Sequence, residues 1–249
     1  MTNYFHRNLN RMALFTALLA AGLILFYRPF MQIAIANIYL NGIIIGTALF
    51  GIGLCFVEMF RLLPEYKWLR TYTSGRAANK MPPRLLRPVA LMLRARPARI
   101  SPANVSGVLE MILNRFDESR ESLRYVTNTL IFLGLLGTFW GLILTVGGFA
   151  ELIGGLNFED ESVLIAMQQG LARPLAGMAT AFTSSLLGLA GSLSVGFLGL
   201  QVQLAQNAIF RELEDYLSSR ARIINDESGE IAALNKNLQR LERAVSEIG

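Results

Sequence analysis

Four apolar stretches, each close to the length that crosses a lipid bilayer, constrain the fold of this 249-residue sequence more than any other feature. About 20 apolar residues are needed to span roughly 30 Å of hydrocarbon. Only 16% of the residues are charged and the mean hydropathy is +0.41, whereas soluble domains carry about 25% charged residues. The sequence therefore predicts an all-α, polytopic membrane protein with four transmembrane helices. The stretches cover Met12–Phe26, Ile35–Phe56, Thr129–Ile153 and Ala172–Leu204.

Cysteine and histidine each occur once, which excludes several kinds of site. Cys55 lies in an apolar run and His6 lies in a short basic N-terminal segment. One copy of the chain can therefore form neither an internal disulfide nor a His/Cys metal site. No paired carboxylates or nucleophile motif lie in or beside the apolar stretches. We expect neither an enzyme nor a bound cofactor.

The charge distribution predicts which side of the membrane each loop occupies. Between Arg61 and Arg124 there are 13 Lys and Arg residues against 5 Asp and Glu residues. The segment between the last two stretches has no Lys or Arg and contains three consecutive acids, Glu159 to Glu161. Because short loops rich in Lys and Arg stay in the cytoplasm, we expect both chain ends inside and the acidic loop outside. The net charge of +5 then reflects topology and contact with lipid headgroups, so no nucleic acid partner is expected.

Two of the predicted helices are longer than a bilayer requires. Five prolines between Pro82 and Pro102 predict a loop with short helical pieces. From Pro102 the pattern is helical without a break to Ile153, and Ser101 suits the N-cap position. From Phe210 to Ile248 the apolar residues follow a heptad pattern that favours a coiled-coil tail. The simpler alternative is a single helix lying on its own cytoplasmic neighbours, and the helix is expected to continue past Gly249.

The last two membrane helices differ in composition from the first two. Small residues thin one side of each, so that helix backbones can approach closely, and hydroxyls gather beside them. Neither helix carries an acid or a base from Thr127 to Phe149 or from Leu175 to Phe210. If the chain conducts ions, the titrating carboxylate must therefore come from another chain. Helix packing alone is the alternative explanation for the glycines. The candidate residues are Gly134, Gly137, Gly141, Gly177 and Gly188 for packing, and Thr138, Thr180, Thr183, Ser184 and Ser185 for an ion pathway.

The segment from Gly134 to Leu142, with Gly137-Thr138 and Trp140-Gly141 at its centre, resembles the GLxGTxWGI signature of the MotA/TolQ/ExbB family. The segment from Met178 to Ser192 is similar to the following helix of that family. The resemblance implies a pentamer around two copies of a single-span partner of the MotB/TolR/ExbD type, which supplies an aspartate and binds peptidoglycan. It also implies proton or sodium flow past that aspartate in the bacterial inner membrane.

Within this resemblance, Thr138 corresponds to the threonine that faces the partner's aspartate. Counting three residues back from Gly188 selects Ser185 as the second hydroxyl, and Thr183 and Ser184 stay as alternatives. Ile131 stands where several members have proline. Four spans are similar to MotA-like members and the long tail is similar to ZorA-like ones. The implied regions are residues 1–62 (two peripheral membrane helices), 63–124 (basic cytoplasmic loop and amphipathic helix), 125–210 (pore-lining helices and acidic periplasmic loop) and 211–249 (helical tail).

Two functions remain open at this point. The first is an ion-conducting subunit of a rotary motor, whose ion and driven process the sequence does not specify. The second is a non-conducting oligomeric membrane scaffold whose coiled-coil tail recruits cytoplasmic partners. The scaffold needs the glycines but has no need of the hydroxyls.

Overall fold

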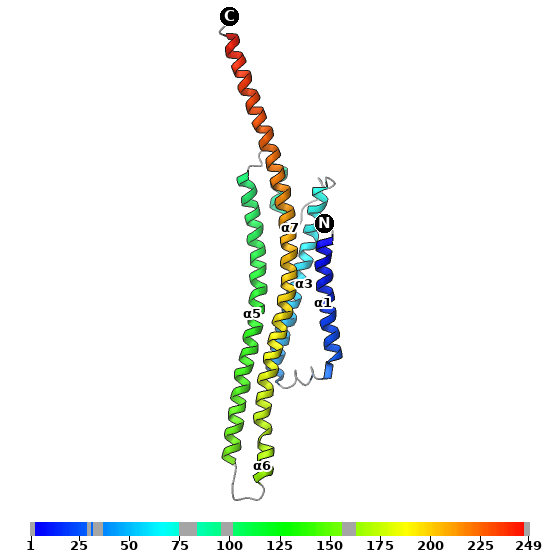
Figure 1. The fold of residues 1–249 in the computed structure, drawn as a ribbon, viewed down its shortest axis with the longest axis vertical. Helices are drawn as coiled ribbons and strands as arrows, with labels where there is room; N and C mark the ends of the chain where they lie inside the picture. The colour runs from blue at the N-terminus through cyan, green and yellow to red at the C-terminus, as the bar shows by residue number, and fades with distance from the viewer. Residues whose placement is uncertain are drawn as a thin grey trace. The chain divides into compact units, whose positions relative to one another are not determined.

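The computed structural model describes residues 3–28, 31, 37–74, 84–95, 102–155 and 163–246. Side chains within these ranges are described except at 3–6, 93–95, 102–104, 163–166 and 221–246. The described residues form helices and a few turns, and none of them lies in a strand (Figure 1). The prediction of an all-helical chain is confirmed for this part of the protein.

Four of the helices are long and apolar enough to cross a membrane. In a bilayer a helix satisfies every backbone N–H and C=O within one segment, so apolar stretches of this length fold as helices. The chain is therefore a membrane-embedded protein with four candidate spans, as the sequence predicted. These helices are α1 (Asn3–Leu25), α3 (Ile38–Thr73), α5 (Pro102–Gly155) and α7 (Ala172–Ser246), and the two short helices are α4 (Arg87–Ala95) and α6 (Val163–Gly170).

The chain divides into two compact units, which are described separately below. The membrane unit comprises Met1–Met59 and Ser119–Leu204. The second unit comprises Phe60–Glu118 and Ala205–Gly249. The helices α3, α5 and α7 each contribute one part to each unit.

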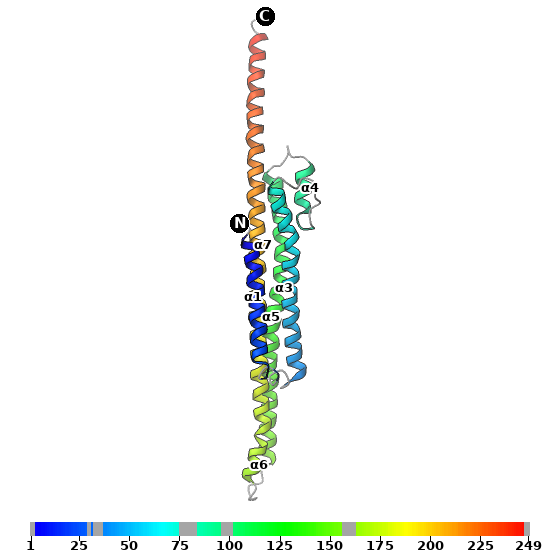
Figure 2. The ribbon, with the colours of Figure 1, turned by 90° about the vertical axis from the view of Figure 1, so that its right-hand side faces the viewer.

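In the membrane unit, α5 and α7 run side by side in opposite directions, and α3 packs against both (Figures 1 and 2). A Cβ added to Gly51 of α3 would lie 2.8 Å from side-chain atoms of both Val126 and Val195. The thiol of Cys55 lies 3.8 Å from the carbonyl oxygen of Val195. On α1, Phe15 packs against Phe197 of α7 with ring centroids 4.4 Å apart. The pair α5–α7 is thus covered by α3 and α1 on part of its surface.

In the second unit, a carboxyl group of α3 holds the start of α4. Glu65 is buried and accepts hydrogen bonds from the backbone N–H groups of Leu85 and Leu86, at 2.8 and 3.2 Å. These donors lie just before the first helical turn, where N–H groups have no partner within the helix. The ring of Tyr72 meets Tyr216 of α7 edge to face at 5.9 Å. Large aliphatic residues of α7, among them Leu213 and Leu217, are completely buried here.

Several helix boundaries match the sequence prediction and others differ from it. The helix α5 begins at Pro102 and continues to Gly155, against a predicted end at Ile153. The helix α3 passes through Pro64 and ends at Thr73, well beyond the apolar stretch that predicted it. Part of the segment expected as a loop before Ala172 forms α6. The acidic residues Glu159 to Glu161 and the cap residue Ser101 lie outside the described residues.

The helix α7 continues without interruption to Ser246. It therefore passes through Ser228 and Gly229, two residues of low helix propensity. Side chains beyond residue 220 are outside the description, so the predicted heptad pairing stays a prediction.

Candidate functional site

A ladder of small residues joins α5 to α7 in the membrane unit. Its steps recur at helical spacing along both helices, and the residue numbers rise on one helix as they fall on the other, which is the register of an antiparallel pair. The same glycines that the sequence selected for close packing form this ladder, here called the glycine seam. Its steps are Gly134 with Gly188, Gly137 with Ser184, Gly141 with Ala181, Thr145 with Gly177 and Gly148 with Pro174.

No side chain larger than hydrogen fits at several of these steps. A Cβ added to Gly188 would lie 2.7 Å from the Cα of Gly134, and one added to Gly177 would lie 2.6 Å from the backbone nitrogen of Thr145. A Cβ on Gly141 would collide with the backbone of Ala181. Because these obstacles are backbone atoms, they cannot move aside as a flexible side chain can. The seam holds the two helices at close to the shortest separation that backbones permit.

A buried polar pair lies on one flank of the seam. Ser184 is fully buried and donates a hydrogen bond of 2.8 Å to the side-chain oxygen of Asn41 on α3. Asn41 is itself fully buried. Leu40, the residue before it, approaches Gly137 across the same contact. Ser184 therefore joins α3 to α7 within one chain, and its hydroxyl is already engaged there.

Thr138 and Ser185 lie on the opposite flank of the seam. Each directly follows a seam residue, Gly137 or Ser184, and one step along a helix turns a side chain by about 100°. Gly137 and Ser184 both lie next to residues of α3, Leu40 and Asn41. The next residue on each helix therefore points away from α3. Gly137 and Ser184 are level with each other, so Thr138 and Ser185 differ by only about 3 Å in height, because one step rises 1.5 Å in opposite directions on the two helices. Both side chains are half-buried.

The remaining hydroxyls of the predicted pathway bond within α7. Thr180 is buried and donates to the carbonyl of Ala176 at 3.0 Å, and half-buried Thr183 donates to the carbonyl of Thr180 at 3.1 Å. Thr138 makes the same kind of bond on α5, to Leu135 at 2.6 Å. A hydroxyl that donates to its own helix keeps its oxygen available as an acceptor. The five predicted residues thus fall into separate places: Thr138 and Ser185 together, Ser184 against α3, and Thr180 and Thr183 on other parts of α7.

Charged residues stand at one end of the seam. Arg173, in the first turn of α7, forms an ion pair with Glu151 near the end of α5, and both side chains are largely exposed. Between these ends the two spans carry no charge, from Thr127 to Phe149 and from Leu175 to Phe210. Among the described residues, no cluster of His, Cys, Asp and Glu could hold a metal ion.

Sequence reasoning missed two buried polar residues of this region. Asn41 carries an amide within an apolar span, and an isolated polar residue at such a position could have been recognised in the sequence as a candidate. Thr145 is buried in the seam, and its hydroxyl lies 2.8 Å from the carbonyl of Gly141 and 3.4 Å from that of Pro174. Thr145 could have been recognised from its spacing, because it follows Gly137 and Gly141 at intervals of four residues along the helix.

Comparisons with protein-family models, with curated proteins and with solved structures find no match to this chain.

Proposed function

We propose that this chain is an ion-conducting subunit of a rotary motor in the bacterial inner membrane. Several copies, five by the resemblance, surround a partner dimer whose single span carries an aspartate. The transported ion is a proton or sodium, and both chain ends are cytoplasmic. The observation that carries the proposal is the presence of two hydroxyl residues, Thr138 and Ser185, at neighbouring heights on the flank of the seam turned away from α3.

The chemistry of this flank suits a shared ion site better than a site built from one chain. Hydroxyl oxygens can accept a hydrogen bond or coordinate a partly dehydrated ion. They titrate poorly, so a neighbouring carboxylate must bind and release the ion, and nearby hydroxyls tune the pKa of that carboxylate. A carboxylate inside a membrane is costly and is kept where it serves an ion path. The acid-free helices α5 and α7 are consistent with an acid that arrives on another chain.

The glycine seam contributes rigidity to this arrangement. With the two backbones in contact, neither helix can rotate without breaking several steps of the ladder. The bond between Ser184 and Asn41 adds a third helix to the same rigid group. Thr138 and Ser185 would therefore keep their spacing while the ring turns around the partner.

The alternative is a non-conducting scaffold, and one observation favours it. The glycine seam is formed by two helices of the same chain, so the glycines do not by themselves require a second protein. A scaffold would use α5 and α7 as a stiff support and the tail as its recruiting segment. The hydroxyls of Thr138 and Ser185 would then be dispensable.

The two functions are separated by replacing Thr138 with valine, which has the same shape and lacks the oxygen. The complex that copurifies with the tagged chain is reconstituted in liposomes, and proton and sodium flux are measured. Under the motor proposal, T138V lowers the flux at least tenfold while the copurifying single-span protein is retained. The matched control is T47V, because Thr47 also lies on a membrane helix and donates to its own helix. Unchanged flux in T138V with the complex intact would contradict the proposal.

A further inference from the structure

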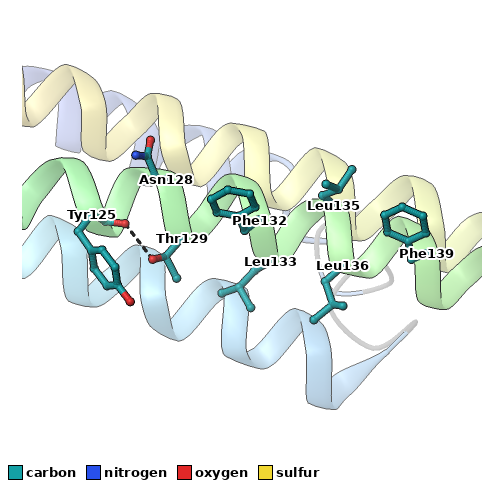
Figure 3. A pocket seen from close by; sticks show the side chains of 8 residues that line it. All are labelled: Tyr125, Asn128, Thr129, Phe132, Leu133, Leu135, Leu136 and Phe139. Carbon is teal, nitrogen blue, oxygen red and sulfur yellow. Dashed lines mark hydrogen bonds between the residues drawn. The ribbon is translucent and has the colours of Figure 1, made fainter.

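A groove runs along the face of α5 that is turned away from the glycine seam. Its volume is about 660 Å³. Figure 3 shows its side chains following one another along the helix, with the rings of Phe132 and Phe139 in its apolar part. The groove belongs wholly to the membrane unit. It is lined by Tyr125, Asn128, Thr129, Phe132, Leu133, Leu135, Leu136 and Phe139.

The apolar part of the groove matches the depth of one leaflet. From Thr129 to Phe139 the helix rises about 15 Å, which is half of the roughly 30 Å hydrocarbon core. The hydroxyl of Thr129 donates to the carbonyl of Tyr125 at 2.8 Å, drawn as the dashed line in Figure 3, so its hydrogen is already engaged. The side chains of Phe132 and Phe139 are 68% and 58% exposed. They offer a hydrophobic surface of the length that an acyl chain of one leaflet would follow.

The other end of the groove has the composition of a membrane–water interface. Tyr125 is 72% exposed and Asn128 is exposed one turn further into the membrane. Tyrosine is enriched at the level of lipid headgroups, where its ring is apolar and its hydroxyl is wet. The apolar stretch of α5 starts here, since Arg124 is its last charged residue before Glu151. The headgroup region therefore begins at about Tyr125.

Two exposed charged residues lie beside this polar end of the groove, with the positive one nearer the hydrocarbon. Arg124 adjoins Tyr125, and Glu121 is one helical turn further from the hydrocarbon. A positive charge thus lies near the hydrocarbon boundary and a negative charge lies about 4–5 Å beyond it along the helix. An aminophospholipid has the complementary order, because its phosphate is attached to the glycerol and its ammonium group lies further out.

We propose that this groove binds one phospholipid with a primary ammonium headgroup, such as phosphatidylethanolamine. One acyl chain lies along Phe132 to Phe139, the guanidinium of Arg124 binds the phosphate, and the carboxylate of Glu121 accepts hydrogen bonds from the ammonium. By the charge distribution of the sequence, this is a lipid of the cytoplasmic leaflet. The inference rests on the membrane placement of α5 and is independent of ion conduction.

The headgroup assignment is tested by reversing the outer charge. The purified complex is equilibrated with equal amounts of phosphatidylethanolamine and phosphatidylglycerol, and the lipids retained are counted by native mass spectrometry. We expect the wild-type chain to retain phosphatidylethanolamine at least fivefold over phosphatidylglycerol, and E121K to reverse that preference. The matched control is E110K, an exposed glutamate on the same helix about 22 Å from Tyr125, which should keep the wild-type ratio. Equal retention of the two lipids by wild type and E121K would overturn the assignment.

The groove itself is tested by filling it. In L136W the larger ring occupies the apolar part, and we expect at least a fivefold loss of retained lipid whatever the headgroup. The control is L186W, because Leu186 is similarly exposed but lies on α7. Wild-type retention in L136W would contradict the proposal. Crosslinking between two copies through L136C in a native membrane would also contradict it, since a second chain would then cover the groove.

Discussion

The helices α5 and α7 bury different kinds of residue along the glycine seam and in the second unit. Along the seam, from Gly134 to Gly148 and from Pro174 to Gly188, their contact consists of Gly, Ala, Ser, Thr and Pro, and backbones meet directly. Beyond the seam the membrane unit also buries larger residues, among them Leu130 and Leu198. In the second unit large residues of the same helices are buried, and five of them are at most 3% exposed. These are Ile112 and Phe116 on α5 and Ile209, Leu213 and Leu217 on α7.

The physical reason is the solvent that each segment displaces. In water, burial of large apolar side chains is the main force that brings helices together. In lipid that force is absent, because the surroundings are as apolar as leucine, and close van der Waals packing of small residues takes its place. Around the seam, large residues point outward instead, for example Phe139 and Phe182, which are 58% and 76% exposed. This contrast is the one expected for a seam that packs in lipid and a second unit that packs in water, which is where the charge distribution of the sequence predicts them to lie.

The largest effect is expected from a large side chain in the glycine seam. In G141L the new side chain meets the backbone of Ala181, so we expect a loss of more than about 3 kcal/mol of unfolding free energy. The matched control is G147L on the same helix, where a Cβ meets nothing within 4 Å. Thermal unfolding of the two variants in detergent measures the difference. If the two variants were equally stable, the close backbone contact described at Gly141 would be wrong.

A loss of similar or smaller size is expected from a cavity in the second unit. L213A removes a side chain that is 0% exposed, and such changes in aliphatic cores cost about 2–5 kcal/mol. L91A is the control, because Leu91 of α4 is 59% exposed and should lose little. Denaturant unfolding followed by circular dichroism compares the two variants. If L91A cost as much as L213A, the aliphatic core described for this unit would be wrong.

The smallest effect is expected at the polar pair on the flank of the seam. Interhelical hydrogen bonds in membranes contribute about 0.6–2 kcal/mol. A double-mutant cycle with N41L and S184A should therefore give a coupling energy within that range. The cycle compares unfolding free energies of the wild type, both single variants and the double variant. Additive losses would show that the bond of 2.8 Å contributes nothing to stability.

Much of the fold could be predicted because it follows from local pattern. Apolar length predicted the four spans, and the helical pattern after Pro102 predicted the start of α5. The extension of α3 past Pro64 could not be predicted in this way, since a proline within a helix is costly and only packing around it can offset that cost. The helix α6 was missed because it is short and follows an acidic segment whose composition is typical of loops.

The candidate site was predicted in composition but not in detail. The stripes of small residues predicted close packing of two helices, and α5 and α7 meet along these residues within one chain. Their place in a pore stays a prediction. The choice between Ser184 and Ser185 depends on where α3 lies against α7, because neighbouring residues of a helix differ by about 100°. That placement is a tertiary fact. The sequence of α7 alone could not show that Asn41, on a helix far away in the chain, accepts a hydrogen bond from the hydroxyl of Ser184.

The pairing of Asn41 with Ser184 also imposes an order on biosynthesis. The two residues are 143 positions apart in the chain. At translation rates of about 5–20 residues per second, Asn41 is synthesised roughly 7–30 s before Ser184. For that time the amide of Asn41 has no hydrogen bond to Ser184. The packing of the N-terminal half is therefore complete only after the last span has been inserted.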